Sequence, residues 1–340
     1  TTSRVHTAVK IEQHYKKSQT VHVLDASRSV TVVEKLLGQQ KEHFISDIKT
    51  DYKKVRENYE KKKGAKRLVA LDKARENAMA LTFDEATITP PNFLGVKTIY
   101  DQDLKVLRKY IDWTPFFQAW ELAGRFPKIL EDEVVGKEAR KLYDDAQKML
   151  DQIIAEKWLT AQANFGLWTA NRIGHDDIEI YDEKGSVINV QHCLRQQTQK
   201  SAKAYNHSLA DFIAPKESGV EDYIGGFVVT AGHGIEEHIQ RFEADHDDYN
   251  AILLKVLADR LAEAYAEYLH EEVRTKHWGY EEGKVYSNDE LIKEKYQGIR
   301  PAPGYPACPD HTEKTGLFEI LEATDKINVK LTESLAMMPA

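Results

Sequence analysis

The sequence predicts an α+β fold: an antiparallel twisted sheet with long flanking helices and a helical arm. Apolar residues recur every three or four positions over 138–158 and 249–278, which is typical of long amphipathic helices. Between these stretches, short β-branched runs are separated by turn residues, which is typical of hairpins. Because the strands come as hairpins and do not alternate regularly with helices, we expect them to pair antiparallel. The chain has 340 residues, 41% of them hydrophobic, which is enough for a sizeable core.

The first expected elements lie in the N-terminal quarter of the chain. Val21–Val33 is typical of a hairpin, or of a strand that leads into a helix. From His43 to Tyr59, apolar residues follow one face of an amphipathic helix, and a second helix is expected from about Leu68 to Leu81. Together these helices predict a helical arm over residues 34–81.

Charge is distributed unevenly along the chain. The net charge of -8 disfavours general nucleic-acid binding. Residues 34–76 contain 13 Lys and Arg against 8 Asp and Glu, whereas residues 243–272 contain 2 against 9. Most such runs are solvated helix faces, but a basic arm on an acidic protein could dock an acidic partner.

Composition also limits where the protein can act. No run approaches the roughly 18–20 apolar residues of a membrane span, and no signal peptide is present, so we expect a cytoplasmic protein without a membrane partner. Cys193 and Cys308 lie far apart in sequence, which fits a reducing compartment better than a disulfide scaffold. Cys308 and His311 would supply only two of the four ligands that zinc requires, so no metal site is predicted. Because the chain begins with Thr1 and not Met, we expect it to be a piece of a longer polypeptide.

An acidic residue follows the first elements of the predicted sheet region. A short strand is expected at Val96–Tyr100, and a helix stripe ends at Ile111, just before Asp112 and Trp113. An acidic residue between an apolar helix and an aromatic segment is either a helix cap or a ligand carboxylate. On general grounds the cap is favoured.

The centre of the chain predicts the strands of the sheet. Ile178–Tyr181 and Val187–Val190 form an expected hairpin with its turn at Lys184-Gly185, and Tyr223–Thr230 forms a further strand. Gly232-His233-Gly234 precedes a helical pattern but lacks the full Gly-x-Gly-x-x-Gly spacing, so we interpret it as a turn.

The longest expected helix is capped by Asp247 or Asp248. Asp259 and Glu263 lie four positions apart and therefore on one face, where two like charges cost a few tenths of a kcal/mol unless a cation is near. An exposed acidic face is the usual case, and a cation-facing surface is the alternative. The histidines of this region are interpreted as surface or satisfied core residues and not as ligands: His246, His270 and His277.

A proline-rich loop, Gly298–Lys314, follows this helix. Four prolines and two glycines exclude helix and central strand, so we expect a rigid, extended connection. Helices are expected on either side at Ser287–Gln297 and Asp310–Glu322, opened by capping signatures: Ser287 with Glu290, and Asp310 with Glu313. From composition alone, a ligand-binding loop that presents Arg300 and Tyr305 and a structural crossover are about equally favoured.

This loop resembles a known binding motif. Its Arg-Pro-Ala-Pro-Gly-Tyr string, Arg300–Tyr305, resembles the Arg-x-x-x-Gly-Tyr signature of the C-terminal reactivation domain of cobalamin-dependent methionine synthase, which binds S-adenosylmethionine. Further blocks resemble the same family in the same order: residues 1–11, 110–117, 209–215, 257–264 and 311–314. The resemblance therefore covers nearly the whole chain. It implies the activation-domain fold of that family, with residues 1–20 as the linker from the cobalamin domain and residues 21–340 as the reactivation domain.

The resemblance also implies a binding site for S-adenosylmethionine. Arg300 would hold the ligand's α-carboxylate in a bidentate pair. Asp112 and Glu263 would contact the ammonium group or the ribose hydroxyls. Ala302 would offer backbone groups to the adenine, and Tyr305 would form an aromatic wall.

The family's chemistry implies further partners. In the family, cobalamin in its inactive Co(II) form is reduced by an electron from flavodoxin and trapped by methyl transfer from S-adenosylmethionine. The resemblance thus implies a cobalamin-binding domain of the same polypeptide and a flavodoxin-like reductase as partners, with Asp259 in an interdomain docking role. No nucleophile or general base is evident, so this part of a methyltransferase of methionine biosynthesis is expected to bind ligand and not to turn over alone.

One departure from the family supports a second interpretation. The family continues past Leu335 into further strands and a terminal helix that contribute an aromatic ligand contact, whereas this chain stops at Ala340, so its end is expected to be truncated. The alternative is an interaction domain that no longer binds ligand and docks a flavodoxin-like reductase and the cobalamin domain. Retention of Asp112, Glu263 and Arg300, together with Tyr305, favours binding.

Overall fold

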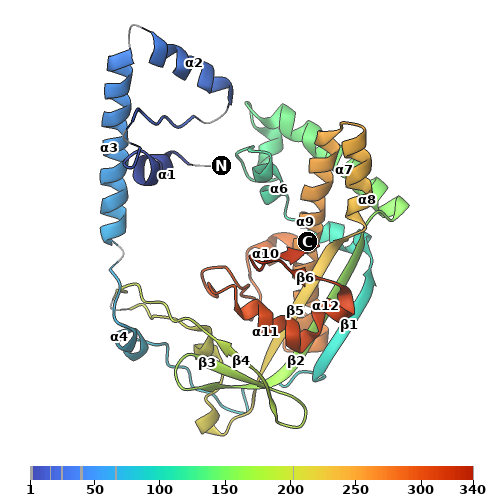
Figure 1. Ribbon diagram of the computed structural model, residues 1–340. Coiled ribbons are helices and arrows are strands. Elements are labelled where there is room, and N and C mark those ends of the chain that lie inside the picture. Colours follow the sequence, from blue (N-terminus) through green and yellow to red (C-terminus); the bar gives the residue numbers. More distant parts are fainter. Residues whose placement is uncertain are drawn as a thin grey trace. The chain divides into compact units, whose positions relative to one another are not determined.

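The computed structural model describes residues 3–15, 17–23, 26–38, 41–65, 67–201 and 203–339 (Figure 1). The chain divides into two compact units. The first comprises residues 1–77 and 196–206, and the second comprises residues 78–195 and 207–340.

The first unit is helical in its described part. Its elements are α1 (Arg4–His6), a π-helical turn (Thr7–Ile11), α2 (Ala26–Leu37), α3 (Lys41–Ala65) and α4 (Leu71–Glu76). Tyr52 of α3 is 2% exposed, and its hydroxyl accepts a hydrogen bond of 2.7 Å from the backbone N–H of His22. Arg56 donates to the carbonyl of Ala8 at 3.1 Å and to Glu12 at 2.7 Å. These contacts hold the N-terminal turn against α3.

The helix expected over 43–59 is confirmed as α3, but two other expectations for this region are wrong. Val30–Val33 lie within α2, and Val21–Val23 form no strand; Leu24 and Asp25 lie outside the described residues. Each β-branched residue costs a helix only a few tenths of a kcal/mol, which the helix-forming residues after Val33 offset. The helix expected at 68–81 is also shorter than predicted, since α4 ends at Glu76.

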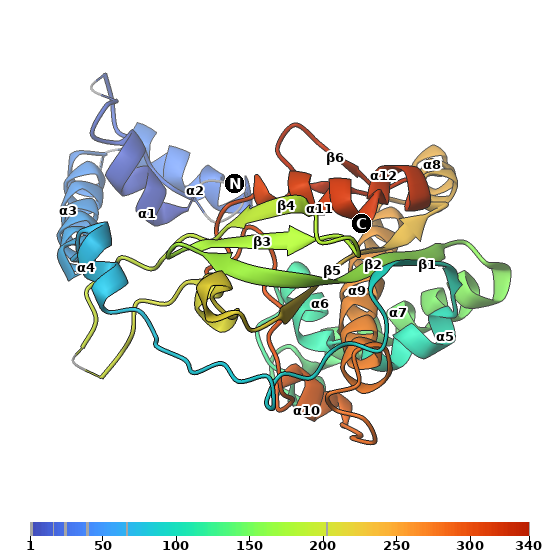
Figure 2. The same ribbon diagram turned by 90° about the horizontal axis from the view of Figure 1, so that it is seen from below.

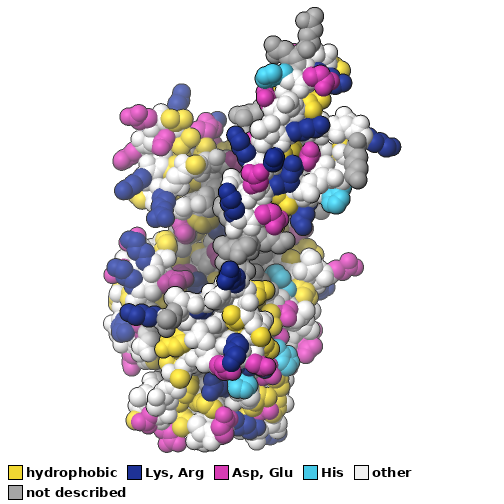
Figure 3. Space-filling model, turned by 90° about the vertical axis from the view of Figure 1, so that its left-hand side faces the viewer, with side chains coloured by type: hydrophobic (Ala, Val, Ile, Leu, Met, Phe, Trp, Pro, Cys, Tyr) yellow, Lys and Arg dark blue, Asp and Glu magenta, His cyan; other side chains and the backbone are white. Residues whose placement is uncertain are grey.

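The charges of α3 are partly paired within the first unit. Arg56 forms an ion pair with Glu12 at 2.7 Å, His43 lies 3.0 Å from Asp47, and Arg4 pairs with Asp51. Figure 3 shows Lys and Arg side chains interspersed with Asp and Glu side chains on the visible face. The basic composition of this segment is therefore offset locally by neighbouring carboxylates.

The second unit is built on a five-stranded antiparallel sheet. Its strands are β1 (Gly95–Gln102), β2 (Thr160–Ile173), β3 (Asp177–Tyr181), β4 (Val187–His192) and β5 (Asp222–His233). Ala163 of β2 pairs with Ile99 of β1 on one side and with Val229 of β5 on the other. Further along β2, Thr169 pairs with Tyr181 of β3, while β5 continues along the opposite edge. The predicted α+β class with an antiparallel sheet is confirmed.

Helices cover both faces of this sheet (Figure 2). One face carries α5 (Leu104–Leu107), α6 (Trp113–Ala119), α7 (Gly136–Glu156), α8 (Ile235–Ala244) and α9 (Asp248–Glu272), which continues as a π-helical turn (Val273–His277). The other face carries α11 (Glu313–Leu321) and α12 (Ala323–Ile327). The remaining elements are α10 (Asn288–Ile292) and a two-stranded ribbon, β6 (Lys330–Leu331) with β7 (Met337–Met338).

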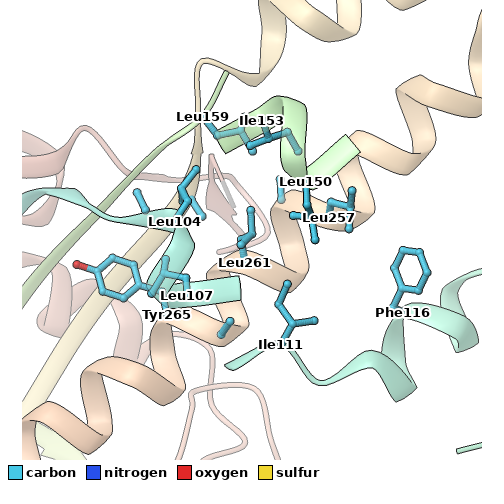
Figure 4. Packing of buried hydrophobic residues seen from close by; sticks show 14 of the residues in the cluster. Leu104, Leu107, Ile111, Phe116, Leu150, Ile153, Leu159, Leu257, Leu261 and Tyr265 are labelled. Carbon is cyan, nitrogen blue, oxygen red and sulfur yellow. The ribbon is translucent and has the colours of Figure 1, made fainter. Parts of the chain in front are cut away.

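Alternation along β2 divides the core between the two faces. Its odd-numbered residues from Ala161 to Leu167 join the cluster formed by α7 and α9, whereas Trp168 and Ala170 join the cluster under α11 and α12. Figure 4 shows Leu257 and Leu261 of α9 among the apolar side chains of α5 and α7. Burial of the apolar face of α9 fixes the position of this helix.

Within the described part of the chain, every helix is too short or too polar to span a bilayer.

The helices that flank the proline-rich loop differ from expectation in detail. The capping box of Ser287 with Glu290 is confirmed, but α10 ends at Ile292. The predicted cap at Asp310 is wrong, because α11 begins only at Glu313. Asp310 instead accepts from the backbone N–H of Thr312 at 2.8 Å, a local side-chain turn that competes with capping.

Candidate functional site

The proline-rich loop folds back on itself between Ala302 and Cys308. The N–H of Gly304 donates to the carbonyl of Cys308 at 2.7 Å, and the N–H of Cys308 donates to the carbonyl of Tyr305 at 2.9 Å. The N–H of Tyr305 donates to the carbonyl of Ala302 at 3.2 Å. The predicted extended connection is therefore a hydrogen-bonded double turn over these residues, since the residues between the prolines retain N–H donors.

Two independent features of position 304 require a glycine. Its φ is +101°, a backbone conformation that side chains disfavour. A Cβ atom at this position would also lie 2.1 Å from Cε1 of the His311 ring. The glycine of the Arg-x-x-x-Gly-Tyr motif thus permits both the turn and the close packing of His311 against it.

Arg300 is held by a carboxylate that sequence analysis did not identify. Its Nη2 donates to Oε2 of Glu267 on α9 at 3.0 Å, and the two side chains are 26% and 13% exposed. Nη1 of Arg300 is buried and has no hydrogen-bond partner among the described residues. Glu267 lies four positions after Glu263, so helical spacing was the available signal for it. The guanidinium keeps donors that could take an anionic ligand group.

A buried polar network lies beneath the start of the loop. Arg274 is 0% exposed; its Nε donates to Glu281 at 3.0 Å, its Nη1 donates to Nδ1 of His270 at 2.7 Å, and its guanidinium carbon lies 3.7 Å from the ring centroid of Tyr296. Glu281 also accepts from the backbone N–H of Gln297 at 2.9 Å. The network therefore anchors the backbone three residues before Arg300.

The charge states within this network follow from burial and hydrogen bonding. Burial would raise the pKa of Glu281, but hydrogen bonds from Gln297 and Tyr286, and from Lys284 and Arg274, outweigh it and lower the pKa to about 2. Burial, reinforced by the charges of Arg274 and Arg300, lowers the pKa of His270 to about 3. His270 is thus neutral at physiological pH and accepts a hydrogen bond from Arg274. The interpretation of His270 as a satisfied core residue is confirmed.

Asp112 caps α6. Its Oδ1 accepts from the backbone N–H of Thr114 at 2.9 Å, which confirms the cap that general grounds favoured. The carbonyl of the preceding residue, Ile111, accepts from the side chain of Asn288 at 3.5 Å, so the start of α6 lies beside the start of α10. Capping engages one carboxylate oxygen and leaves the other for a second contact.

Asp259 and Glu263 lie on one exposed face of α9, as their spacing predicts. Neither carboxylate forms a hydrogen bond within the described residues. Desolvation by the surrounding protein raises the pKa of Asp259, with the charge of Arg260 opposing this effect and the charge of Glu263 adding to it. This face is acidic and free to meet a cation.

The structure brings together some of the predicted residues. Arg300 contacts α9 through Glu267, which lies four residues, about one helical turn, after Glu263. Ala302 and Tyr305 share one turn, in which Tyr305 is 62% exposed, but within the described residues no hydrogen bond or ion pair joins them to the other predicted residues. The predicted residues comprise a guanidinium, carboxylates and an exposed aromatic ring, which are the groups that a ligand with a carboxylate, an ammonium group and a flat ring system requires.

Two hollows elsewhere on the surface lie apart from the predicted site residues. A hollow of about 290 Å³ is lined by Trp168 and Tyr181, and one of about 350 Å³ by Phe318 and Leu331; neither is lined by a predicted site residue. In the described ranges, His, Cys, Asp and Glu side chains form no group of three that could hold a metal ion.

Comparisons with known proteins agree on one family. The family model described as vitamin B12-dependent methionine synthase, activation domain, matches residues 103–340. A solved structure described as the MetH reactivation domain bound to AdoHcy is 55% identical in sequence. The alignment covers 80% of this chain and 83% of that chain, with a TM-score of 0.76.

Proposed function

Because the chain belongs to the activation-domain family of vitamin B12-dependent methionine synthase, we propose that it binds S-adenosylmethionine and presents the methyl group to cobalamin. The observation that carries this proposal is the Arg300 guanidinium, fixed by Glu267 on one side and retaining an unpartnered Nη1 among the described residues. The solved relative supports it, since its ligand, AdoHcy, is S-adenosylmethionine without the transferred methyl group.

Each predicted residue has a role that its surroundings support. Arg300 takes the α-carboxylate, because a guanidinium matches the geometry of a carboxylate. Asp112 and Glu263 take the ammonium group or ribose hydroxyls, with the oxygens that capping and the exposed helix face leave available. Ala302 contributes backbone groups and Tyr305 an exposed ring beside the adenine.

The proposed mechanism relies on positioning. Cobalamin, held by another domain of the enzyme, would supply the nucleophilic cobalt once a reductant had reduced it from Co(II). Transfer of a methyl group from a sulfonium leaves a neutral thioether, so this chain needs to orient the donor and does not need to move a proton. Proximity and orientation of this kind can supply several kcal/mol of a reaction barrier. Asp259, on the same face of α9 as Glu263, is proposed to contact the cobalamin domain when the two domains meet.

A flavodoxin-like reductase is the proposed electron donor, and docking without ligand binding is the second candidate function. The basic composition of the arm supports docking, because a basic segment can dock an acidic partner. The ion pairs of Arg4 and Arg56 reduce this support, since they neutralise part of the segment's charge. We therefore rank ligand binding first.

The test uses the complete enzyme with cobalamin in the Co(II) form. With a reductant and S-adenosylmethionine, the return to methylcobalamin is followed by absorbance. Arg300→Ala is expected to slow this reactivation at least tenfold at limiting S-adenosylmethionine, because a charge-assisted hydrogen bond contributes about 1.5–3 kcal/mol. Arg140→Ala, which changes an exposed arginine of α7, is the control. Equal reactivation rates for the two variants would contradict the proposal.

A further inference from the structure

We propose that Glu267 is the positioning residue that orients Arg300 toward the α-carboxylate of the ligand, an inference that rests on the proposed function. The two side chains meet through one hydrogen bond of 3.0 Å, from Nη2 of Arg300 to Oε2 of Glu267. Arginine and carboxylate groups frequently pair through two parallel hydrogen bonds. Here a single contact holds one nitrogen of the guanidinium and leaves Nη1 without a partner among the described residues.

The pair leaves two buried polar atoms without hydrogen-bond partners among the described residues. Nη1 of Arg300 and Oε1 of Glu267 are both inaccessible to solvent and lack hydrogen-bond partners among the described residues. Leaving a buried polar group unpaired costs about 1–3 kcal/mol. A ligand carboxylate that engages the guanidinium would satisfy its remaining donors and recover part of this cost.

The charge of Arg274 also acts on Glu267. Residues 267, 270 and 274 follow one another at helical spacing along α9 and its π-helical continuation, so their side chains share a face. Burial raises the pKa of Glu267; the charge and hydrogen bond of Arg300 and the charge of Arg274 oppose this rise without cancelling it. Arg274 is fixed by Glu281 and His270, and its Nη2 is also buried without a partner in the described chain. Glu267 thus interacts with two cations, one buried and one at the ligand loop.

A positioning role for Glu267 predicts a different effect of its loss than a general structural role does. Without the carboxylate, the two guanidinium groups would repel each other across a poorly solvated space, and Arg300 would turn away from α9. The turn at Ala302–Cys308 has its own hydrogen bonds and would remain in place. Loss of Glu267 should therefore affect the amino-acid end of the ligand and spare the adenosine end.

The test compares two ligands by calorimetric titration of this chain. S-adenosylhomocysteine carries the α-carboxylate, whereas 5′-methylthioadenosine lacks the amino-acid portion. Glu267→Ala is expected to weaken the first ligand about 10- to 100-fold, the loss of roughly one hydrogen bond to a charged group, and to change the second less than about twofold. Glu267→Gln keeps an acceptor oxygen and should weaken the first ligand about three- to tenfold. Glu272→Gln, at a surface pair with Lys276 on the same helix, is the matched control and should change neither.

A double-mutant comparison adds the decisive readout. In an Arg300→Ala background, Glu267→Gln should cause no further loss of S-adenosylhomocysteine affinity, because the group that it orients is gone. Additive losses, or equal weakening of both ligands, would overturn the inference; Glu267→Gln carries this test if the alanine variant does not fold. Failure of the unmutated chain to bind S-adenosylhomocysteine would overturn the proposed function itself. If binding is lost in Arg300→Ala but is unchanged in both Glu267 variants, only this inference is overturned.

Discussion

Gly304 controls the shape of the candidate loop at a single position. Its φ of +101° and the overlap that a Cβ atom would have with the His311 ring act together. We expect Gly304→Ala to lower S-adenosylhomocysteine affinity at least tenfold, because the turn must move to relieve a strain of about 1–3 kcal/mol and a steric overlap. Titration of the variant measures this effect.

A matched control separates strain from overlap. Gly283 also has a positive φ, of +77°, but a Cβ atom there would meet nothing within 4 Å. Gly283→Ala should therefore cost stability without changing affinity. If Gly304→Ala binds as tightly as Gly283→Ala, the packing of His311 against the turn has no role in binding.

For single residues, the sequence predicted features that depend on local spacing better than contacts between residues far apart in the chain. The cap at Asp112 and the shared face of Asp259 and Glu263 depend on local spacing, and both are observed. The pairing of Arg300 with Glu267 joins residues 33 positions apart. No local periodicity encodes such a contact, because it depends on how the loop returns to α9.

Among helices and strands, stretches with strong hydrophobic periodicity were predicted correctly, whereas a strand of low strand propensity was missed. The long helices α7 and α9 and the hairpin β3–β4 agree with the expected stretches. The central strand β2 was not predicted. It contains Ala161, Ala163 and Gly166, which have low strand propensity, and residues 163–168 are buried without interruption because both faces of the sheet are covered. Its identity as a strand is set by its neighbours.

The inner face of α9 predicts a pH dependence of stability. His270 has a folded-state pKa of about 3, below its ordinary value of 6.5, because it is buried and because Arg274, Arg300 and Glu281 are the charged groups that act on it. As pH falls below 6.5, the unfolded chain binds a proton that the folded chain does not, so stability is complete above pH 6.5 and is lost toward pH 3. The pKa of Glu281 is also lowered, but its contribution is lost only between about pH 4.5 and 2.

Urea unfolding measures this effect in the window where His270 acts and Glu281 does not. Between about pH 7.5 and 5.5, the unfolding free energy should fall by about 1.4 kcal/mol more in the unmutated chain than in His270→Gln. Glutamine keeps an acceptor for Arg274 and does not titrate. The same pH dependence in both proteins would show that His270 is not buried in its neutral form.

At the scale of the whole molecule, the chain returns to its first unit through a central segment. The N–H of Val69 donates to the carbonyl of Gln197 at 2.9 Å, and the N–H of Gln199 donates to the carbonyl of Arg67 at 2.7 Å. Residues 196–206 therefore belong with the N-terminal unit, although they follow β4 in sequence. A pairing over about 130 residues leaves no periodic signal, so composition and spacing could not predict it.

Ligand binding by the Arg300 loop of the second unit can be measured by titration. S-adenosylhomocysteine is titrated calorimetrically into this chain and into its Arg300→Ala variant. We expect saturable binding to the unmutated chain and at least tenfold weaker binding to the variant, since a charge-assisted hydrogen bond contributes about 1.5–3 kcal/mol. Absence of binding to the unmutated chain, or equal affinity for the two proteins, would contradict this expectation.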